Sequence, residues 1–232
     1  MENSVKQARI AGLLYLVVVI TGIFSLMYVP NKIIVWDNAT LTLQNIIKNE
    51  SLFRLGIVSG LICYSAFLFL VLSLYQLLKS VHESISKLMV ILALISVPMY
   101  FINAQNLLTI LSFINDAIYN QLWSTNELAS QVFIKLEQYN SGMSVIHIFS
   151  GLWLFPFGYL VYKSNFLPKI FGVLLMMGCF GYLINFAGHT LIKDFSYLGI
   201  GFYISLPSSL GEIGICLWML IVGCKFNLSE TF

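Results

Sequence analysis

The sequence contains six apolar stretches that are each long enough to cross a lipid bilayer as a helix. They lie approximately at residues 10–28, 55–78, 88–111, 145–162, 170–187 and 202–222. A bilayer core about 30 Å thick requires about 20 residues of helix. Backbone amide and carbonyl groups find no water in this layer, and a helix satisfies them within the segment. We therefore expect an all-α membrane protein in which six transmembrane helices form one bundle.

The composition agrees with a membrane protein and excludes a nucleic-acid partner. Hydrophobic residues make up 59% of the chain and charged residues 9%, whereas charged residues make up about 25% of soluble domains. The net charge is +2 and the basic residues are scattered, without the basic patch that nucleic acid requires. We expect residues 1–232 to form a single integral membrane domain surrounded by lipid, with an uncleaved first helix that is longer than a signal-peptide core.

The distribution of Lys and Arg predicts the orientation of the chain. If the N-terminus is cytoplasmic, seven basic residues lie inside and five lie outside. The connections after the second and fourth spans are short and basic, as cytoplasmic loops usually are. We therefore expect a multi-pass protein of the cell membrane with both termini in the cytoplasm. The inner residues are Lys6, Arg9, Lys79, Lys87, Lys163, Lys169 and Lys225, and the outer ones are Lys32, Lys48, Arg54, Lys135 and Lys193.

The long connection before the fourth span carries a helix signal of its own. Ser124 and Glu127 have the spacing of a capping box, in which the two side chains satisfy backbone groups at a helix start. Apolar residues follow at positions that are partly compatible with a helix on the membrane surface. We expect a helical connector here. A lid over the outer face is the alternative.

Glu212 is the acidic residue that interrupts the last apolar stretch. A charged group left unpaired inside a bilayer costs roughly 2.5 kcal/mol or more, so such a residue is a candidate for function. In the predicted orientation it lies near the middle of the membrane or slightly outside it. Arg54 and His147 are the candidate partners for its charge. Arg54 also has a rival partner, because Glu50 precedes it by four residues.

Further polar residues fall in the outer halves of the predicted spans. Asn103 and Asn106 share one helix face, and Asn185 and His189 share another. Together with His147, they predict a partly hydrated pocket that opens to the outside. The alternative for the asparagines is a purely structural one, since polar side chains often join membrane helices by hydrogen bonds.

These residues favour a protein that binds or moves a small or lipid-like ligand. In this interpretation Glu212 is a charge or proton site, and Asn103 and Asn106 orient the ligand by hydrogen bonds. Another alternative is a structural or regulatory partner of a second membrane protein. The glycine-rich helix faces are the feature that favours it.

A membrane-embedded, metal-assisted hydrolase is the alternative from the enzymes. His147, His189 and Glu212 could supply a site of two histidines and one carboxylate. The sequence has no H-E-x-x-H or H-x-x-E-H spacing, and the candidate ligands come from three separate spans. We therefore expect no metal and no cofactor, and we favour a protein that is not an enzyme.

Several segments follow one another in an order that is typical of a known family. They are "ARIAGLLYLVVVITGI", "ESLFRLGIVSGL", "LYQLLKSVHESISKLMVIL", "GLWLFPFGYLVYKSNFLPKIFGVLL" with "GYLI", and "GEIGICLWMLIVG". From Ala8 to Gly223 the chain resembles the membrane-protein family called domain of unknown function 4386. The resemblance implies a mainly prokaryotic six-span protein and supplies no catalytic residues. Arg54 and Glu212 lie inside the resembling segments.

Overall fold

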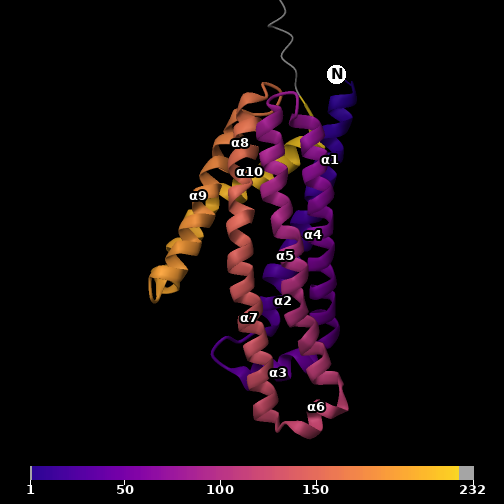
Figure 1. The fold of residues 1–232 in the computed structure, drawn as a ribbon, viewed down its shortest axis with the longest axis vertical. Helices are drawn as coiled ribbons and strands as arrows, with labels where there is room; N and C mark the ends of the chain where they lie inside the picture. Colours follow the sequence, from indigo (N-terminus) through magenta and orange to yellow (C-terminus); the bar gives the residue numbers. More distant parts are fainter. Residues whose placement is uncertain (1, 225–232) are drawn as a thin grey trace, which may run out of the picture. The chain divides into compact units, whose positions relative to one another are not determined.

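A computed structural model describes residues 2–224 of the protein, and its regular elements within this range are helices (Figure 1). Six helical segments in the described part are long and apolar enough to cross a membrane. The expected all-α fold with six spans is therefore confirmed. The segments are Ser4–Ile33, Glu50–Leu78, Glu83–Asn115, Thr125–Lys163, Lys169–Leu191 and Ile200–Ile221.

The first and fourth spans are each built from more than one helical element. The first contains a π-helical turn, η1, and the fourth is interrupted at Trp153. In chain order the elements are α1 (Glu2–Ile23), η1 (Phe24–Tyr28), α2 (Val29–Ile33), α3 (Ala39–Lys48), α4 (Glu50–Leu78), α5 (Glu83–Asn115), α6 (Ala117–Leu122), α7 (Thr125–Leu152), α8 (Leu154–Lys163), α9 (Lys169–Leu191), η2 (Phe195–Leu198) and α10 (Ile200–Ile221).

The predicted capping box forms at the start of α7. The backbone N–H and the hydroxyl of Ser124 donate to Glu127 Oε2 at 2.8 and 2.7 Å. No proline interrupts the following residues, and α7 continues without a break to Leu152. The expected connector is thus the beginning of the fourth spanning helix. Its apolar residues Leu128, Val132 and Leu136 are buried in a protein core, which fits a connector and not a surface lid.

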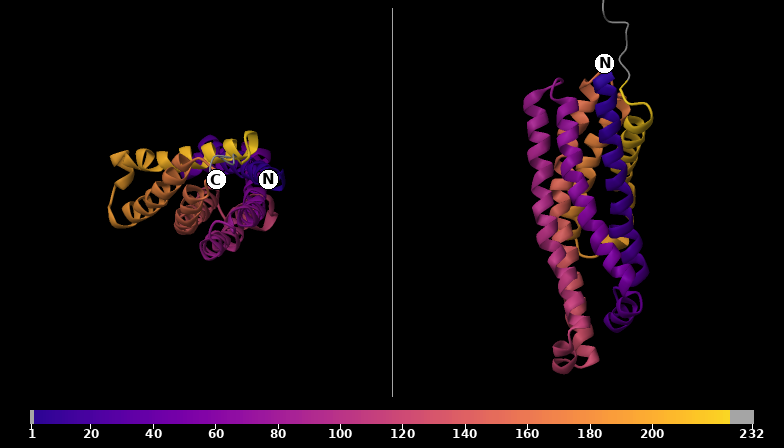
Figure 2. Two further views of the ribbon diagram at one scale, coloured as in Figure 1. Left: turned by 90° about the horizontal axis from the view of Figure 1, so that it is seen from above. Right: turned by 90° about the vertical axis from the view of Figure 1, so that its right-hand side faces the viewer.

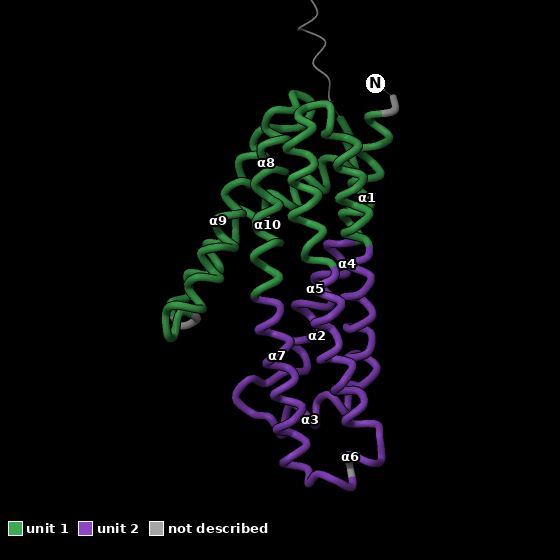
Figure 3. Tube along the Cα trace, in the orientation of Figure 1, with its two compact units in different colours: residues 1–17, 66–97, 145–232 green, residues 18–65, 98–144 purple. Residues whose placement is uncertain are grey.

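The chain divides into two compact units, which are described separately (Figure 3). Unit 1 comprises residues 1–17, 66–97 and 145–232, and unit 2 comprises residues 18–65 and 98–144. Helices α1, α4, α5 and α7 each contribute residues to both units. That the whole chain acts as one membrane domain stays a prediction.

Unit 2 is built around one apolar cluster. The cluster joins α2, α3, α4, α5 and α7, and it buries large side chains such as Ile46, Ile110 and Val132. Asn38 caps α3, because its Oδ1 accepts a hydrogen bond from the backbone N–H of Leu41 at 2.9 Å. The cap fixes where α3 begins, and α3 can then cover the cluster with its apolar face.

In unit 1, the first half of α1 packs antiparallel against the second half of α10. The thiol of Cys216 donates to the carbonyl of Gly12, and that of Cys224 donates to the carbonyl of Ser4, both at 3.6 Å. The start of α1 and the end of α10 therefore lie side by side (Figure 2).

Glycines allow the helices of each unit to approach closely. A Cβ atom added at Gly12 would lie 2.5 Å from the backbone nitrogen of Leu220, and one at Gly178 would lie 2.6 Å from Cβ of Ser208. The same holds for the other glycines of the predicted glycine-rich faces: Gly56, Gly60, Gly151, Gly158, Gly172, Gly181, Gly211 and Gly214 each meet a neighbouring helix of their own unit. Because these faces pack inside the chain, they no longer favour a second membrane protein as a partner.

The first prediction concerns the orientation of the spans. Ser84 and Asn126 are both exposed, Ser84 near the start of α5 and Asn126 near the start of α7. Single cysteines at these positions, in a variant without the four native cysteines, should react differently with a membrane-impermeant thiol reagent. In intact cells Asn126→Cys should be labelled, and Ser84→Cys should react only after the membrane is opened. The reverse pattern would contradict a cytoplasmic N-terminus.

The second prediction tests the contact between α1 and α10. Gly12→Ala should lower the thermal stability of the protein in detergent by about 1–3 kcal/mol, because backbone atoms of Met219 and Leu220 occupy the space of the new Cβ. Gly22→Ala is the matched control in the same helix. Its Cβ would lie 3.4 Å from Sγ of Cys63, an ordinary contact. Alanine favours a helix over glycine by about 1 kcal/mol, so the control should be neutral or stabilising.

Candidate functional site

Glu212 lies on α10 between residues that pack inside unit 1 and residues that face outward. Gly211 and Ile215 are buried, whereas Leu210 and Ile213 are exposed. Glu212 itself is partly buried. Its carboxyl group therefore lies at the edge of the helix contact, on a helix that is otherwise apolar enough to span a membrane.

Two tyrosines from other helices hold the carboxyl group. The hydroxyl of Tyr15, on α1, donates a hydrogen bond to Glu212 Oε2 at 3.0 Å. Tyr182, on α9, also makes a side-chain hydrogen bond with Glu212. Tyr15 is almost fully buried, with 1% of its surface exposed. Three helices of unit 1 thus contribute to one polar cluster, which we call the Glu212 cluster.

The close glycine contacts explain why these three side chains meet. Gly12 precedes Tyr15 by one helical turn, and its contact with α10 brings the tyrosine against that helix. On α9, Gly178 and Gly181 lie within the turn before Tyr182 and pack against Ser208 and Ile204 of α10. The cluster therefore depends on backbones that lie nearly in contact on both sides of Glu212.

His147 joins the cluster through Tyr182. Its ring lies 5.9 Å from the ring of Tyr182, measured between centroids, with an angle of 56° between the ring planes. Gly151, one turn further along α7, leaves room for the Cβ of Tyr182. The sequence analysis proposed His147 as a direct partner of Glu212, and the structure instead places Tyr182 next to both residues.

Arg54 has the rival partner that the sequence suggested. Its Nη2 and Nε atoms lie 2.6 and 2.7 Å from Glu50 Oε1, and Asn115 Nδ2 donates to the same oxygen at 3.1 Å. These three residues belong to unit 2. Within residues 2–224 the ion pairs are Arg54–Glu50 and Lys87–Glu83, so Glu212 has no cationic partner in the described part of the chain.

Asn103 and Asn106 also lie in unit 2, where they make hydrogen bonds that fit a structural role. The side-chain amide of Asn103 donates to the carbonyl of Tyr139 at 2.8 Å, which joins α5 to α7. Asn106 donates to the carbonyl of Asn103 at 3.2 Å. A Cβ atom at Gly142 would collide with Asn103, so this glycine leaves the space for the asparagine. The bonds between helices agree with the structural alternative for these residues.

Asn185 and His189 lie on α9 beyond Tyr182. Asn185 Nδ2 donates to Ser205 Oγ at 2.9 Å and to the carbonyl of Gly201 at 3.4 Å, whereas its buried Oδ1 has no hydrogen-bond partner. His189 is exposed, and its ring lies 5.0 Å from the ring of Phe195. Since Asn185 follows Tyr182 by three residues, both lie on the same side of α9.

The structure does not assemble the metal site that the hydrolase alternative requires. Among residues 2–224, no three His, Cys, Asp or Glu side chains lie close enough together to hold a metal ion. His147 contacts Tyr182, whereas His189 contacts Phe195. The group of His147, His189 and Glu212, which the hydrolase alternative requires, is therefore not brought together in the described part of the chain.

Tyr15 and Tyr182 are the site residues that the sequence analysis missed. Both are tyrosines within apolar stretches, and a buried tyrosine hydroxyl usually has a hydrogen-bond partner. This rule could have marked them as candidates for a bond with Glu212. It could not have selected them, because other tyrosines also lie in the spans and the helix contacts decide which one reaches the carboxyl group.

The fold and the polar cluster define a helical integral membrane protein with six spans and a carboxyl group held within one of them. Residues 10–223 match the sequence model of the family described as "Domain of unknown function (DUF4386)". The chain belongs to this family, which confirms the resemblance noted from its sequence segments.

A protein of Archaeoglobus fulgidus described as "Uncharacterized protein" is similar to part of the chain. The two are 32% identical over 92 residues, which cover 40% of this chain and 52% of the archaeal protein. The chain thus spans about half the length of this relative. No solved structure matches the chain.

The third prediction tests the bond between Tyr15 and Glu212 by a double-mutant cycle. Tyr15→Phe and Glu212→Leu should each destabilise the protein, and together they should cost less than the sum by about 0.5–1.5 kcal/mol, because either change alone removes the bond. Thermal unfolding in detergent of the wild type, both single variants and the double variant gives this coupling energy.

Tyr203, which lies on α10, provides the control for this cycle. Tyr203 is 70% exposed and lies nine residues before Glu212. Tyr203→Phe removes the same hydroxyl group, and combined with Glu212→Leu it should be additive. Additivity of Tyr15→Phe with Glu212→Leu would contradict the hydrogen bond.

Proposed function

We propose that this protein binds or moves a small or lipid-like ligand within the cell membrane, and that Glu212 is the polar group that the ligand meets. One observation carries the proposal. A carboxyl group on a membrane-spanning helix is held by the hydroxyl groups of Tyr15 and Tyr182, and in the described part of the chain no cation neutralises it. Placing such a group in a membrane costs free energy, so its presence makes it a candidate for function.

The chemistry of the Glu212 cluster limits the kind of ligand. A carboxylate has two oxygens with about four sites that accept hydrogen bonds, and two tyrosine hydroxyl groups fill only part of them. A ligand with an amine or a hydroxyl group would supply the missing donor, and a proton would do the same. The exposed Leu210 and Ile213 beside Glu212 favour a ligand with an apolar body.

Asn185 and His147 extend the polar surface on either side of Tyr182. The buried Oδ1 of Asn185 has no hydrogen-bond partner among the side chains that the structure describes, so we propose it as a second acceptor for a ligand donor. The imidazole of His147 packs beside Tyr182 and adds a second polar ring to this surface. Under this proposal, and with a cytoplasmic N-terminus, this surface would contribute to the outward-facing pocket expected from the sequence.

The other two functions have less support. A metal-assisted hydrolase lacks an assembled metal site among residues 2–224. A role as the partner of another membrane protein was favoured by the glycine-rich faces, which pack against the chain's own helices. Binding or movement of a ligand is therefore the function that the geometry supports best.

The fourth prediction tests whether Glu212 holds a ligand. The wild type and Glu212→Leu are purified in a mild detergent, and the small molecules and lipids that accompany each are extracted and quantified by mass spectrometry. A compound with an amine or hydroxyl group should accompany the wild type and fall at least about tenfold in Glu212→Leu, since the loss of a buried charged or hydrogen-bonded contact costs about 1.5–3 kcal/mol.

Glu50→Leu is the matched control, because it removes an exposed carboxylate that pairs with Arg54. It should keep the compound at the wild-type level. Thermal unfolding of both variants shows whether they are folded. Identical extracts from the wild type and from folded Glu212→Leu would contradict the proposal.

A further inference from the structure

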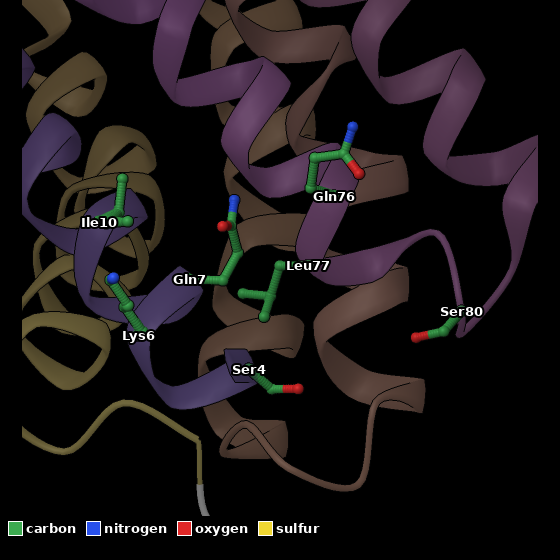
Figure 4. A pocket seen from close by; sticks show the side chains of 7 residues that line it. All are labelled: Ser4, Lys6, Gln7, Ile10, Gln76, Leu77 and Ser80. Carbon is green, nitrogen blue, oxygen red and sulfur yellow. The ribbon is translucent and has the colours of Figure 1, made fainter. Parts of the chain in front are cut away.

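Two cavities lie beside the first turns of α1 in unit 1, and Figure 4 shows the residues that line the first of them. The first, which we call the polar cavity, has a volume of about 490 Å³. The second, which we call the apolar groove, has a volume of about 580 Å³. Lys6 and Ile10 line both of them, so the two spaces share a wall.

The polar cavity is lined by groups that donate hydrogen bonds. Figure 4 shows Lys6 and Gln7 of α1 on one side, with Gln76 of α4 and Ser80 on the other. Gln76 Oε1 accepts a hydrogen bond from Lys79 at 2.7 Å, which leaves the amide N–H groups of Gln76 to donate to a ligand. Gln7 Nε2 already donates to the carbonyl and the hydroxyl of Ser73, at 3.2 and 3.1 Å. The remaining donors are the ammonium of Lys6, the amide of Gln76 and the hydroxyl of Ser80, and together they suit an oxyanion such as a phosphate.

The positive charge at this position is not neutralised by the described part of the chain. Lys6 and Arg9 are both exposed and lie on one side of α1, three residues apart. Among the side chains that the structure describes, which do not include those of Glu2 and Asn3, the ion pairs involve neither of the two cations. Arg9 lines the apolar groove and Lys6 lines both spaces, so the two cations lie at the wall that the polar cavity and the groove share.

The apolar groove continues from these cations along α1 and α10. Besides Lys6 and Arg9 it is lined by Val5, Ile10, Leu13 and Leu220. Ile10 and Leu13 are 42% and 56% exposed. Leu13 lies seven residues after Lys6, or about 10 Å further along the helix. A ligand that fits both spaces therefore has an anionic end and an apolar chain.

We propose that this region binds an anionic phospholipid, with its phosphate between Lys6 and Arg9 and an acyl chain along Ile10, Leu13 and Leu220. The neighbouring donors of Gln76 and Ser80 hold the phosphate oxygens or the headgroup. Basic pockets between transmembrane helices at the membrane surface are suited to such headgroups. The proposal is independent of Glu212, of the ligand proposed for it and of the orientation of the chain.

The test measures the binding of two lipids by native mass spectrometry of the full-length protein in detergent. Phosphatidylglycerol and phosphatidylcholine with identical acyl chains are titrated separately. The wild type should bind phosphatidylglycerol more tightly. The double variant Lys6→Gln/Arg9→Gln should weaken this binding roughly 25-fold, as expected for two lost cation contacts, and leave phosphatidylcholine unchanged. Equal affinities of the wild type for both lipids would overturn the proposal.

A second double variant controls for net charge. Lys163→Gln/Lys169→Gln removes the same number of positive charges from unit 1, at the end of α8 and the start of α9. This variant should bind phosphatidylglycerol like the wild type. An equal loss in both double variants would overturn the specific site. If the Lys6→Gln/Arg9→Gln protein does not fold, each single change should still weaken binding roughly fivefold.

Inorganic phosphate and Leu13→Asn separate a lipid from a free anion. Phosphate alone should compete only weakly with phosphatidylglycerol, and Leu13→Asn should weaken phosphatidylglycerol binding because the acyl chain loses an apolar contact. Strong competition by phosphate together with unchanged lipid binding in Leu13→Asn would overturn the lipid proposal in favour of a free-anion site.

Discussion

Close contact between helix backbones is the constraint on which the rest of this structure depends. Lipid tails are as apolar as leucine, so the hydrophobic effect does not by itself hold one spanning helix against another. Van der Waals packing takes its place, and it is strongest where small residues let backbones approach. Gly12, Gly178 and Gly181 provide such approaches between α10 and its neighbours α1 and α9. The Glu212 cluster forms between these contacts, and a loosened α10 would separate its members.

The partners of Glu212 influence what its carboxyl group can do. A lysine or arginine beside Glu212 would stabilise the ionised carboxylate in an ion pair, like the pair of Glu50 with Arg54. Tyrosine hydroxyl groups hydrogen-bond a carboxylate without neutralising it, and they can also bond its protonated form. Tyr15 and Tyr182 therefore orient Glu212 and can hydrogen-bond its carboxyl group in both the ionised and the protonated form. A group that exchanges a proton or binds a ligand requires this property.

Hydropathy, spacing and composition predicted the elements of this fold well. The six spans follow from the length of the apolar stretches, the start of α7 follows from Ser124 and Glu127, and the pair of Arg54 with Glu50 follows from their spacing of four residues. Each of these features is local in the chain. Glu212 was also recognisable, because one carboxylate in an apolar helix is chemically conspicuous.

The neighbours of Glu212 could not be predicted in the same way. Tyr15 and Glu212 are separated by 197 positions in the chain, and nothing local joins them. An apolar helix shows little difference between its faces, so its rotation and its partners depend on packing details that hydropathy does not contain. For the same reason, Arg54 and Glu212 were considered as partners although they lie in different units, and His147 was expected to contact Glu212 without Tyr182.

The contact between α1 and α10 has a consequence for resistance to oxidation. Two of its hydrogen bonds come from cysteines, Cys216 and Cys224, which donate to backbone carbonyls of α1. Oxidants attack the thiolate form of cysteine, and burial raises the pKa of the Cys224 thiol to about 11, so almost none of it is ionised at neutral pH. The packing that buries Cys224 against α1 thus also protects its thiol from oxidation.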